Sequence, residues 1–371
     1  MVSVVSVTRS RRGPASRLKR LPKLTAPLLR LNGLAPYYTM FPLSFPFDAL
    51  ANSKAGEWVI DPFCGRGTSI LAARLRGLPS VGVDSNPVAG AIAAAKLPQV
   101  RAYEIIALAR DILAHVHPGP VSATPQGEFW DLCYAPSTLR DICRIRNYLL
   151  AQCSTRVEVA LRGVLFGILH GPLIKARTYL SNQMPRTYST KPVPAVRYWR
   201  KKNLTPPEIG VLKTLSRRAR FSFEAVPPST LGKVITGDSR TFNFTDLETK
   251  FSWVITSPPY YGMRTYFPDH WLRNWFVGGP NDVDYRADEQ VSHHSEAQFV
   301  SDLATVWKMA EVSVPGAKPI CRFGALPGCK KASRSLTRRF PAEADCGPGN
   351  TQQVKRQKVT EARDLCPVWA A

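Results

Sequence analysis

The sequence predicts an α/β protein with a doubly wound parallel sheet, and the order of its apolar segments carries this prediction. Short apolar runs at Trp58–Ile60 and Ser80–Asp84 are each followed by a stretch with helical spacing, Thr68–Gly77 and Asn86–Leu97. Continuous apolar runs are typical of parallel strands that are buried on both faces. The strand–helix–strand–helix order is the opening of a doubly wound sheet.

A second set of apolar runs continues this sheet later in the chain. Strands are predicted at Lys233–Asp238, Phe251–Thr256 and Lys318–Phe323, and an amphipathic helix at Ala297–Val312. Beyond Leu326 neither alternation nor a helical pattern is visible. We therefore predict that the C-terminal strands that would close the sheet are missing.

Composition points to a polyanionic partner. The chain has 371 residues and a formal net charge of +23. An excess of lysine and arginine on this scale favours nucleic acid, because these side chains neutralise phosphates and release counterions. The eight cysteines show no C-x-x-C pair, so a reduced intracellular compartment is expected and no metal site is predicted. No run approaches the ~18 apolar residues of a membrane span.

The chain divides into five predicted segments. They are a basic N-terminal arm (1–36), a first core segment (37–100), a helical and basic insertion (101–230), a second core segment (231–327) and an irregular basic tail (328–371). The arm has no apolar stretch of the kind that marks a secretory signal, and its composition also suits an organellar transit peptide. We prefer an arm that lies on DNA.

The second half of the insertion, Gly171–Pro228, predicts a nucleic-acid surface. It is strongly basic, its prolines predict irregular structure, and Tyr179, Tyr198 and Trp199 are interleaved with the charge. Such a mixture suits contacts to phosphates, sugars and unpaired bases, although a solvated basic loop is the alternative. The candidate DNA-binding residues are Lys191, Arg197, Arg200, Lys201, Lys202, Arg217 and Arg218.

Two motifs at strand ends resemble one enzyme family. VIDPFCGRGT (Val59–Thr68) and VITSPPYYG (Val254–Gly262) resemble the cofactor and catalytic motifs of S-adenosylmethionine-dependent DNA methyltransferases that modify N4 of cytosine or N6 of adenine. The resemblance implies a class I methyltransferase sheet with an inserted target-recognition region, and S-adenosyl-L-methionine as cofactor. It also implies double-stranded DNA with an extruded base as partner, a cognate restriction endonuclease as a further partner, and a place in the cytoplasm at the nucleoid.

The resemblance also assigns cofactor-binding residues. Asp61 would accept a hydrogen bond from the ammonium of the methionine moiety. Asp84 would accept hydrogen bonds from the ribose hydroxyls, and Asp238 would accept one from the adenine amine. Asp84 or Ser85 could instead cap the following helix. The other residues assigned to the cofactor are Thr39, Phe41, Phe63, Gly65, Gly67 and Thr68. The two glycines allow a tight turn and close backbone approach to the ligand.

The second motif supplies the candidate catalytic residues Ser257, Pro258, Pro259 and Tyr260. A base amine is a poor nucleophile and needs acceptors that hold its hydrogens, which Ser257 and the Pro258 carbonyl would supply. Tyr260 would stack on the extruded base. Serine in the first position favours cytosine N4. The alternatives are an N6-adenine DNA methyltransferase, an RNA or tRNA base methyltransferase, and a non-catalytic DNA-binding relic.

Overall fold

A six-stranded sheet forms the centre of the computed structural model, which describes residues 26–37, 41–116, 124–173, 178–185, 191–259, 268–283, 295–307, 312–323 and 358–361. The strands are β1 (Val59–Asp61), β2 (Ser80–Asp84), β3 (Gly232–Thr236), β4 (Phe251–Thr256), β5 (Ser313–Phe323) and β6 (Lys358–Glu361). Their order is β3-β2-β1-β4-β5-β6, with β1 to β5 parallel. The prediction of a doubly wound α/β fold is confirmed.

The register brings the predicted motifs to one edge of the sheet. Ile60 of β1 pairs with Val81 of β2 on one side and with Val254 of β4 on the other. Because the strands are parallel, the loops that follow β1, β2 and β4 all leave from the same edge. The strand order reverses at β1, because β2 and β3 follow on one side of it and β4 and β5 on the other.

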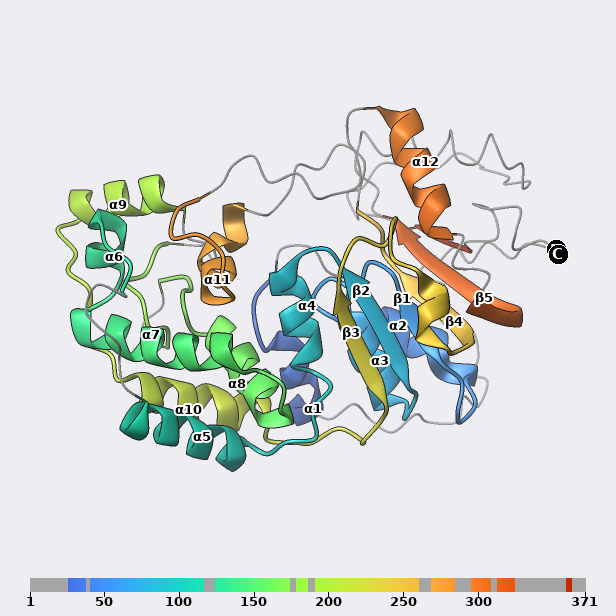
Figure 1. Cartoon of the computed structure of the whole chain (residues 1–371), viewed down its shortest axis with the longest axis horizontal. Coiled ribbons are helices and arrows are strands. Elements are labelled where there is room, and N and C mark those ends of the chain that lie inside the picture. The colour runs from blue at the N-terminus through green and yellow to red at the C-terminus, as the bar shows by residue number, and fades with distance from the viewer. Residues whose placement is uncertain are drawn as a thin grey trace, which may run out of the picture.

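Each face of the sheet is covered by a different set of helices. Val59 and Trp253 face the larger core, to which α2 (Ser44–Ala49), α3 (Thr68–Leu75) and α4 (Pro87–Ala94) contribute. Leu31, which directly follows α1 (Ala26–Arg30), belongs to the same core. Ile60 and Val254 face a smaller cluster with Trp307 of α12 (Glu296–Trp307). Figure 1 shows α12 apart from the other helices, beside β5.

The insertion between α4 and β3 is helical. Its helices are α5 (Ala102–His115), α6 (Glu128–Cys133), α7 (Pro136–Ala151), α8 (Arg156–Phe166), α9 (Pro192–Lys201) and α10 (Val211–Ser222). They gather to one side of the sheet (Figure 1), where α5 packs on α7, α8 and α10, and α8 packs on α4. A further helix, α11 (Trp271–Phe276), joins them after the catalytic motif. Its Trp275 ring centroid lies 4.6 Å from that of Trp130 in α6.

Two predictions about the basic half of the insertion need correction. Prolines were expected to break regular structure, as Pro206 and Pro207 do, but Pro192 and Pro194 lie in the first turn of α9, where a missing N–H and a fixed φ are tolerated. Trp199 was expected at a nucleic-acid surface, but it is fully buried, and its Nε1 donates to the Gln183 carbonyl at 3.1 Å. Tyr179 is buried as well.

The last residues of the predicted N-terminal arm belong to the core. Leu31, Leu34 and Ala35 are buried between the sheet helices and the insertion. Arg30 forms an ion pair with Glu224, just after α10. Residues 1–25, for which a DNA-binding role is predicted, lie outside the described residues.

The tail contributes one strand that the sequence pattern did not reveal. β6 pairs antiparallel with β5, with Cys321 opposite Thr360 and Arg322 opposite Val359. Strand KVTE has two adjacent β-branched residues but is only four residues long, too short to show alternation. The prediction that the sheet ends at its fifth strand is therefore wrong.

Candidate cofactor and catalytic site

The two motifs meet through Asp61. This carboxylate is fully buried at the end of β1. Its Oδ1 accepts the Thr256 hydroxyl from β4 at 2.6 Å and the Phe63 N–H at 3.1 Å, while Oδ2 accepts the Ser69 hydroxyl from α3. Burial raises the pKa of Asp61 to about 6, although these hydrogen bonds oppose the rise. One carboxylate thus joins β1, β4 and α3, the helix after the turn.

The glycine turn has the backbone that only glycine adopts without strain. Gly65 and Gly67 have φ of 51° and 74°. A Cβ on Gly67 would lie 2.7 Å from the Ala93 Cβ of α4, so this glycine lets two helices approach closely. A Cβ on Gly65 would meet nothing within 4 Å, which leaves space in front of the turn. The buried Thr68 then begins α3.

Asp84 holds this turn from the next strand. Its Oδ2 accepts the Gly65 N–H at 2.8 Å and its Oδ1 accepts the Asn86 N–H at 2.9 Å. Asn86 caps α4, because its side chain accepts the Val88 N–H at 2.9 Å. The alternative in which Asp84 or Ser85 caps the helix is therefore wrong. Burial raises the pKa of Asp84 to about 6.

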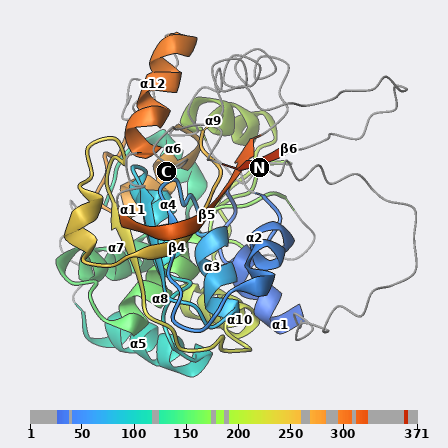
Figure 2. The same ribbon diagram turned by 90° about the vertical axis from the view of Figure 1, so that its right-hand side faces the viewer.

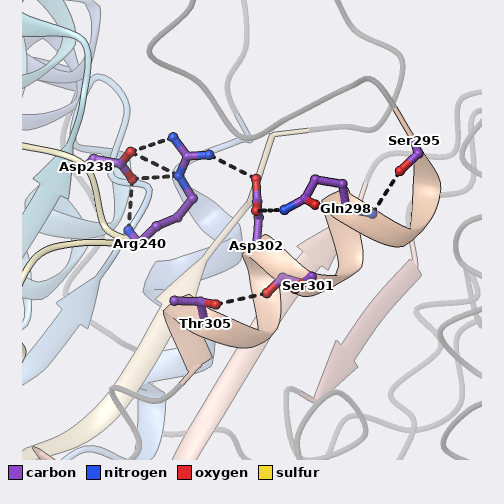
Figure 3. Close-up of polar contacts among 7 residues, drawn as sticks. All are labelled: Asp238, Arg240, Ser295, Gln298, Ser301, Asp302 and Thr305. Atoms are coloured by element: carbon purple, nitrogen blue, oxygen red, sulfur yellow. Dashed lines mark hydrogen bonds and ion pairs between the residues drawn. The ribbon is translucent and has the colours of Figure 1, made fainter.

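Asp238 lies in the loop after β3 and has a partner that the sequence reasoning missed. Arg240 donates to both Asp238 oxygens, with Nη2 to Oδ2 at 2.6 Å, and its Nη1 reaches Asp302 Oδ2 of α12 at 3.0 Å (Figure 3). Gln298 donates to the other Asp302 oxygen at 2.8 Å. Burial raises the pKa of Asp238, but the hydrogen bonds and charge of Arg240 outweigh it and lower the pKa overall. The carboxylate is thus held ionised and oriented.

The Ser-Pro-Pro motif begins beside the Asp-Pro-Phe-Cys-Gly motif. Ser257 follows β4, and its hydroxyl donates to the Arg322 carbonyl of β5 at 2.9 Å. This bond fixes the hydroxyl hydrogen and leaves the oxygen lone pairs as acceptors. Pro258 is buried and Pro259 half-buried. Tyr260, like Thr39 of the cofactor assignment, lies outside the described residues.

The two aromatic residues assigned to the cofactor are both half-buried. Phe63 packs against Phe299 and Leu303 of α12. Phe41 lies edge-on to Phe45, with ring centroids 5.4 Å apart. Phe63 is thus supported from α12 and Phe41 from α2, so the two rings pack against different helices.

The candidate DNA-binding residues do not form one surface. α9 and α10 lie at opposite ends of the helical part in both views (Figures 1 and 2). Arg197, Arg200, Lys201 and Lys202 of the α9 region are exposed, as is Arg217 of α10. Three of the assigned side chains have partners within the protein: Lys191 pairs with Asp269 at 2.9 Å, Arg200 pairs with Glu128, and Arg218 donates to the Gly167 carbonyl at 2.8 Å.

Comparison with known proteins adds little to this geometry. No protein-family model and no curated protein matches the chain. Two solved structures of the rRNA methyltransferase aviRa from Streptomyces viridochromogenes are similar at 14% identity. Each comparison covers 89% of both chains, with TM-scores of 0.31 and 0.30. At these values the likeness carries no weight for function, and the fold assignment rests on the strand order.

Neither a membrane-spanning helix nor a cluster of metal-ligating side chains occurs among the described residues. Among them, no helix combines the length and apolar character needed to cross a membrane. Within the same ranges, His, Cys, Asp and Glu side chains do not gather in groups of three or more that could hold a metal ion.

Proposed function

We propose that the protein is an S-adenosylmethionine-dependent methyltransferase that modifies an exocyclic amine of a DNA base, with cytosine N4 as the favoured target. The observation that carries this proposal is the hydrogen bond from Thr256 to Asp61. It joins the strand that ends in Asp-Pro-Phe-Cys-Gly to the strand that ends in Ser-Pro-Pro. The two motifs, separated by almost two hundred residues of sequence, are adjacent in space.

The residues at this edge fit the proposed cofactor. Asp61 and Asp84 would be the acceptors for an ammonium and for ribose hydroxyls, and the open side of Gly65 leaves room for a ligand beside the turn. S-adenosylmethionine would supply an electrophilic methyl group on its sulfonium. Asp238, oriented by Arg240, would accept the adenine amine.

The protein's part in the reaction would be alignment. Ser257 already donates its hydrogen to Arg322, so its oxygen would accept a hydrogen of the base amine. The Pro258 carbonyl would accept the second hydrogen, since two successive prolines restrict the backbone that presents it. Tyr260 would stack on the extruded base. Positioning and electrostatics, without a covalent enzyme intermediate, would then turn the amine lone pair toward the methyl group.

Basic side chains of α9 support DNA as the partner. The catalytic motif leads through Asp269 into α11, and Asp269 pairs with Lys191 at the start of α9. Phe129 of α6 contacts both Trp199 of α9 and Trp271 of α11, at centroid distances of 5.7 and 5.0 Å. The exposed Lys201 and Lys202, at the end of α9, are thus linked through packed rings to the helix that follows the Ser-Pro-Pro motif.

Transfer of tritiated methyl groups to oligonucleotides tests the proposal. We expect labelling of duplex DNA and not of structured RNA. Tyr260→Ala should abolish transfer, and Ser257→Ala should reduce it less, because the Pro258 carbonyl remains. Tyr103→Ala removes a ring that is 67% exposed on α5 and is the matched control, which should retain full activity. Labelling of RNA alone would identify an RNA methyltransferase, and cofactor binding without transfer to either would identify a relic.

A further inference from the structure

Arg66, between the two glycines of the turn, is buried without a partner. The residue is 6% exposed, and its Nε has no hydrogen-bond partner in the described part of the chain. Two other buried arginines of the described residues use their Nε in hydrogen bonds, whereas the Nε of the buried Arg322 has none. Arg74 donates from Nε to the Pro228 carbonyl at 2.9 Å, and Arg273 donates from Nε to the Phe166 carbonyl at 2.9 Å. An unpaired buried charge destabilises a folded protein, so it needs an explanation.

The surroundings of Arg66 add positive charge. Lys96, just after α4, is fully buried and donates to Asn32 Oδ1 at 3.2 Å. Burial lowers the pKa of Lys96, and the charge of Arg66 lowers it further. Burial lowers the pKa of Arg66 only to about 10, so the guanidinium is charged at neutral pH. Within the described residues, neither cation forms a salt bridge with a carboxylate.

The turn is therefore flanked by charges of both signs. Asp61 and Asp84 lie at the ends of β1 and β2, and Arg66 lies five residues after Asp61 in the same loop. The open side of Gly65, next to Arg66, is where a ligand has room. Such an arrangement is complementary to a small zwitterion, whose cationic and anionic groups would meet opposite sides of one turn.

We propose that Arg66 binds the carboxylate of the amino-acid end of the cofactor, an inference that rests on the proposed function. When the ammonium of the cofactor binds Asp61, the cofactor's own carboxylate lies close by and needs a cationic partner. A guanidinium binds a carboxylate through two parallel hydrogen bonds. The burial of Arg66, a residue that is only 6% exposed, favours a small ligand over a phosphate of duplex DNA. The free energy that the unpaired charge costs the empty protein is recovered when the ligand binds.

Calorimetry with two ligands tests this pairing. S-adenosylmethionine and its decarboxylated analogue differ by the carboxylate alone. We expect Arg66→Met to weaken S-adenosylmethionine binding about ten- to a hundredfold and to leave binding of the analogue unchanged or tighter. Arg66→Lys should restore part of the loss. Arg220→Met removes the same charge from an exposed position of α10 and is the control, which should bind both ligands as the wild type does.

Thermal unfolding of the ligand-free protein gives a readout besides binding. Because Arg66 has no partner, Arg66→Met should unfold at the same temperature as the wild type or higher. An equal loss of affinity for both ligands, with a lowered unfolding temperature, would show that Arg66 only shapes the turn. Unchanged cofactor affinity with weaker binding of duplex DNA would assign the guanidinium to a phosphate. Either result overturns the inference, whereas a wild type that binds neither ligand overturns the proposed function itself.

Discussion

The buried carboxyl of Asp61 should give the protein a measurable dependence of stability on pH. Burial raises its pKa from 3.8 to about 6. Between these values the folded protein holds the proton and the unfolded chain does not. The protonated carboxyl therefore favours folding at low pH, and this contribution is lost as the pH rises through 6. A shift of about two units at ~1.4 kcal/mol each corresponds to ~3 kcal/mol, of which about 2 kcal/mol falls between pH 4.5 and 7.5.

Asp61→Asn removes the titration and keeps the shape. With the amide oxygen at the Oδ1 position, the bonds from Thr256 and Phe63 are kept, and the Ser69 hydroxyl can rotate to accept an amide hydrogen, so the variant should fold. We expect the free energy of unfolding of the wild type, relative to Asp61→Asn, to fall by about 2 kcal/mol as the pH rises from 4.5 to 7.5. Urea unfolding across that range measures this difference. Asp282→Asn, at an exposed carboxylate, is the control and should follow the wild type. Parallel curves for the wild type and Asp61→Asn would refute the reasoning.

Two further predictions concern the turn and the DNA surface. Gly67→Ala should destabilise the protein by roughly 2–4 kcal/mol, because of its positive φ and the 2.7 Å approach to Ala93. Gly65→Ala, with nothing within 4 Å, should cost only about 1 kcal/mol in denaturant unfolding, and equal losses would argue against close packing at Gly67. Replacing Lys201 and Lys202 with glutamine should flatten the slope of log DNA affinity against log salt by up to ~2 × 0.9. The control is the same change at two other exposed lysines, Lys54 before β1 and Lys233 at the start of β3, which should leave that slope unaltered. An equal effect of both pairs would mean that α9 has no special role in DNA binding.

The sequence predicted those parts of the site that depend on local pattern. The Phe251–Thr256 strand was predicted with the bounds that the structure shows. The turns at Gly65 and Ser257 follow directly from strand ends, and a doubly wound sheet brings such ends together. The contact between Asp61 and Thr256 was beyond this reasoning, because it joins strands 195 residues apart in sequence.

Other features were missed because their signal is weak or misleading. Trp199 lies between arginines and lysines, which suggested a surface, yet it lies four residues after Ala195 on the buried side of α9. That helical spacing was the signal that could have found it. Arg240 stands two residues after Asp238, but its second partner, Asp302, lies on a helix far along the chain. The lack of a partner for Arg66 can be found only once the packing around it is known.

Nucleoside mass spectrometry of DNA from cells that express the protein tests the central claim most directly. The account predicts N4-methylcytosine in DNA from cells with the wild type, and none in cells with Tyr260→Ala at equal expression. N6-methyladenine in its place would correct the target base. If neither modified base is found although the purified protein binds S-adenosylmethionine, the claim that these two adjacent motifs form a DNA methyltransferase site is contradicted.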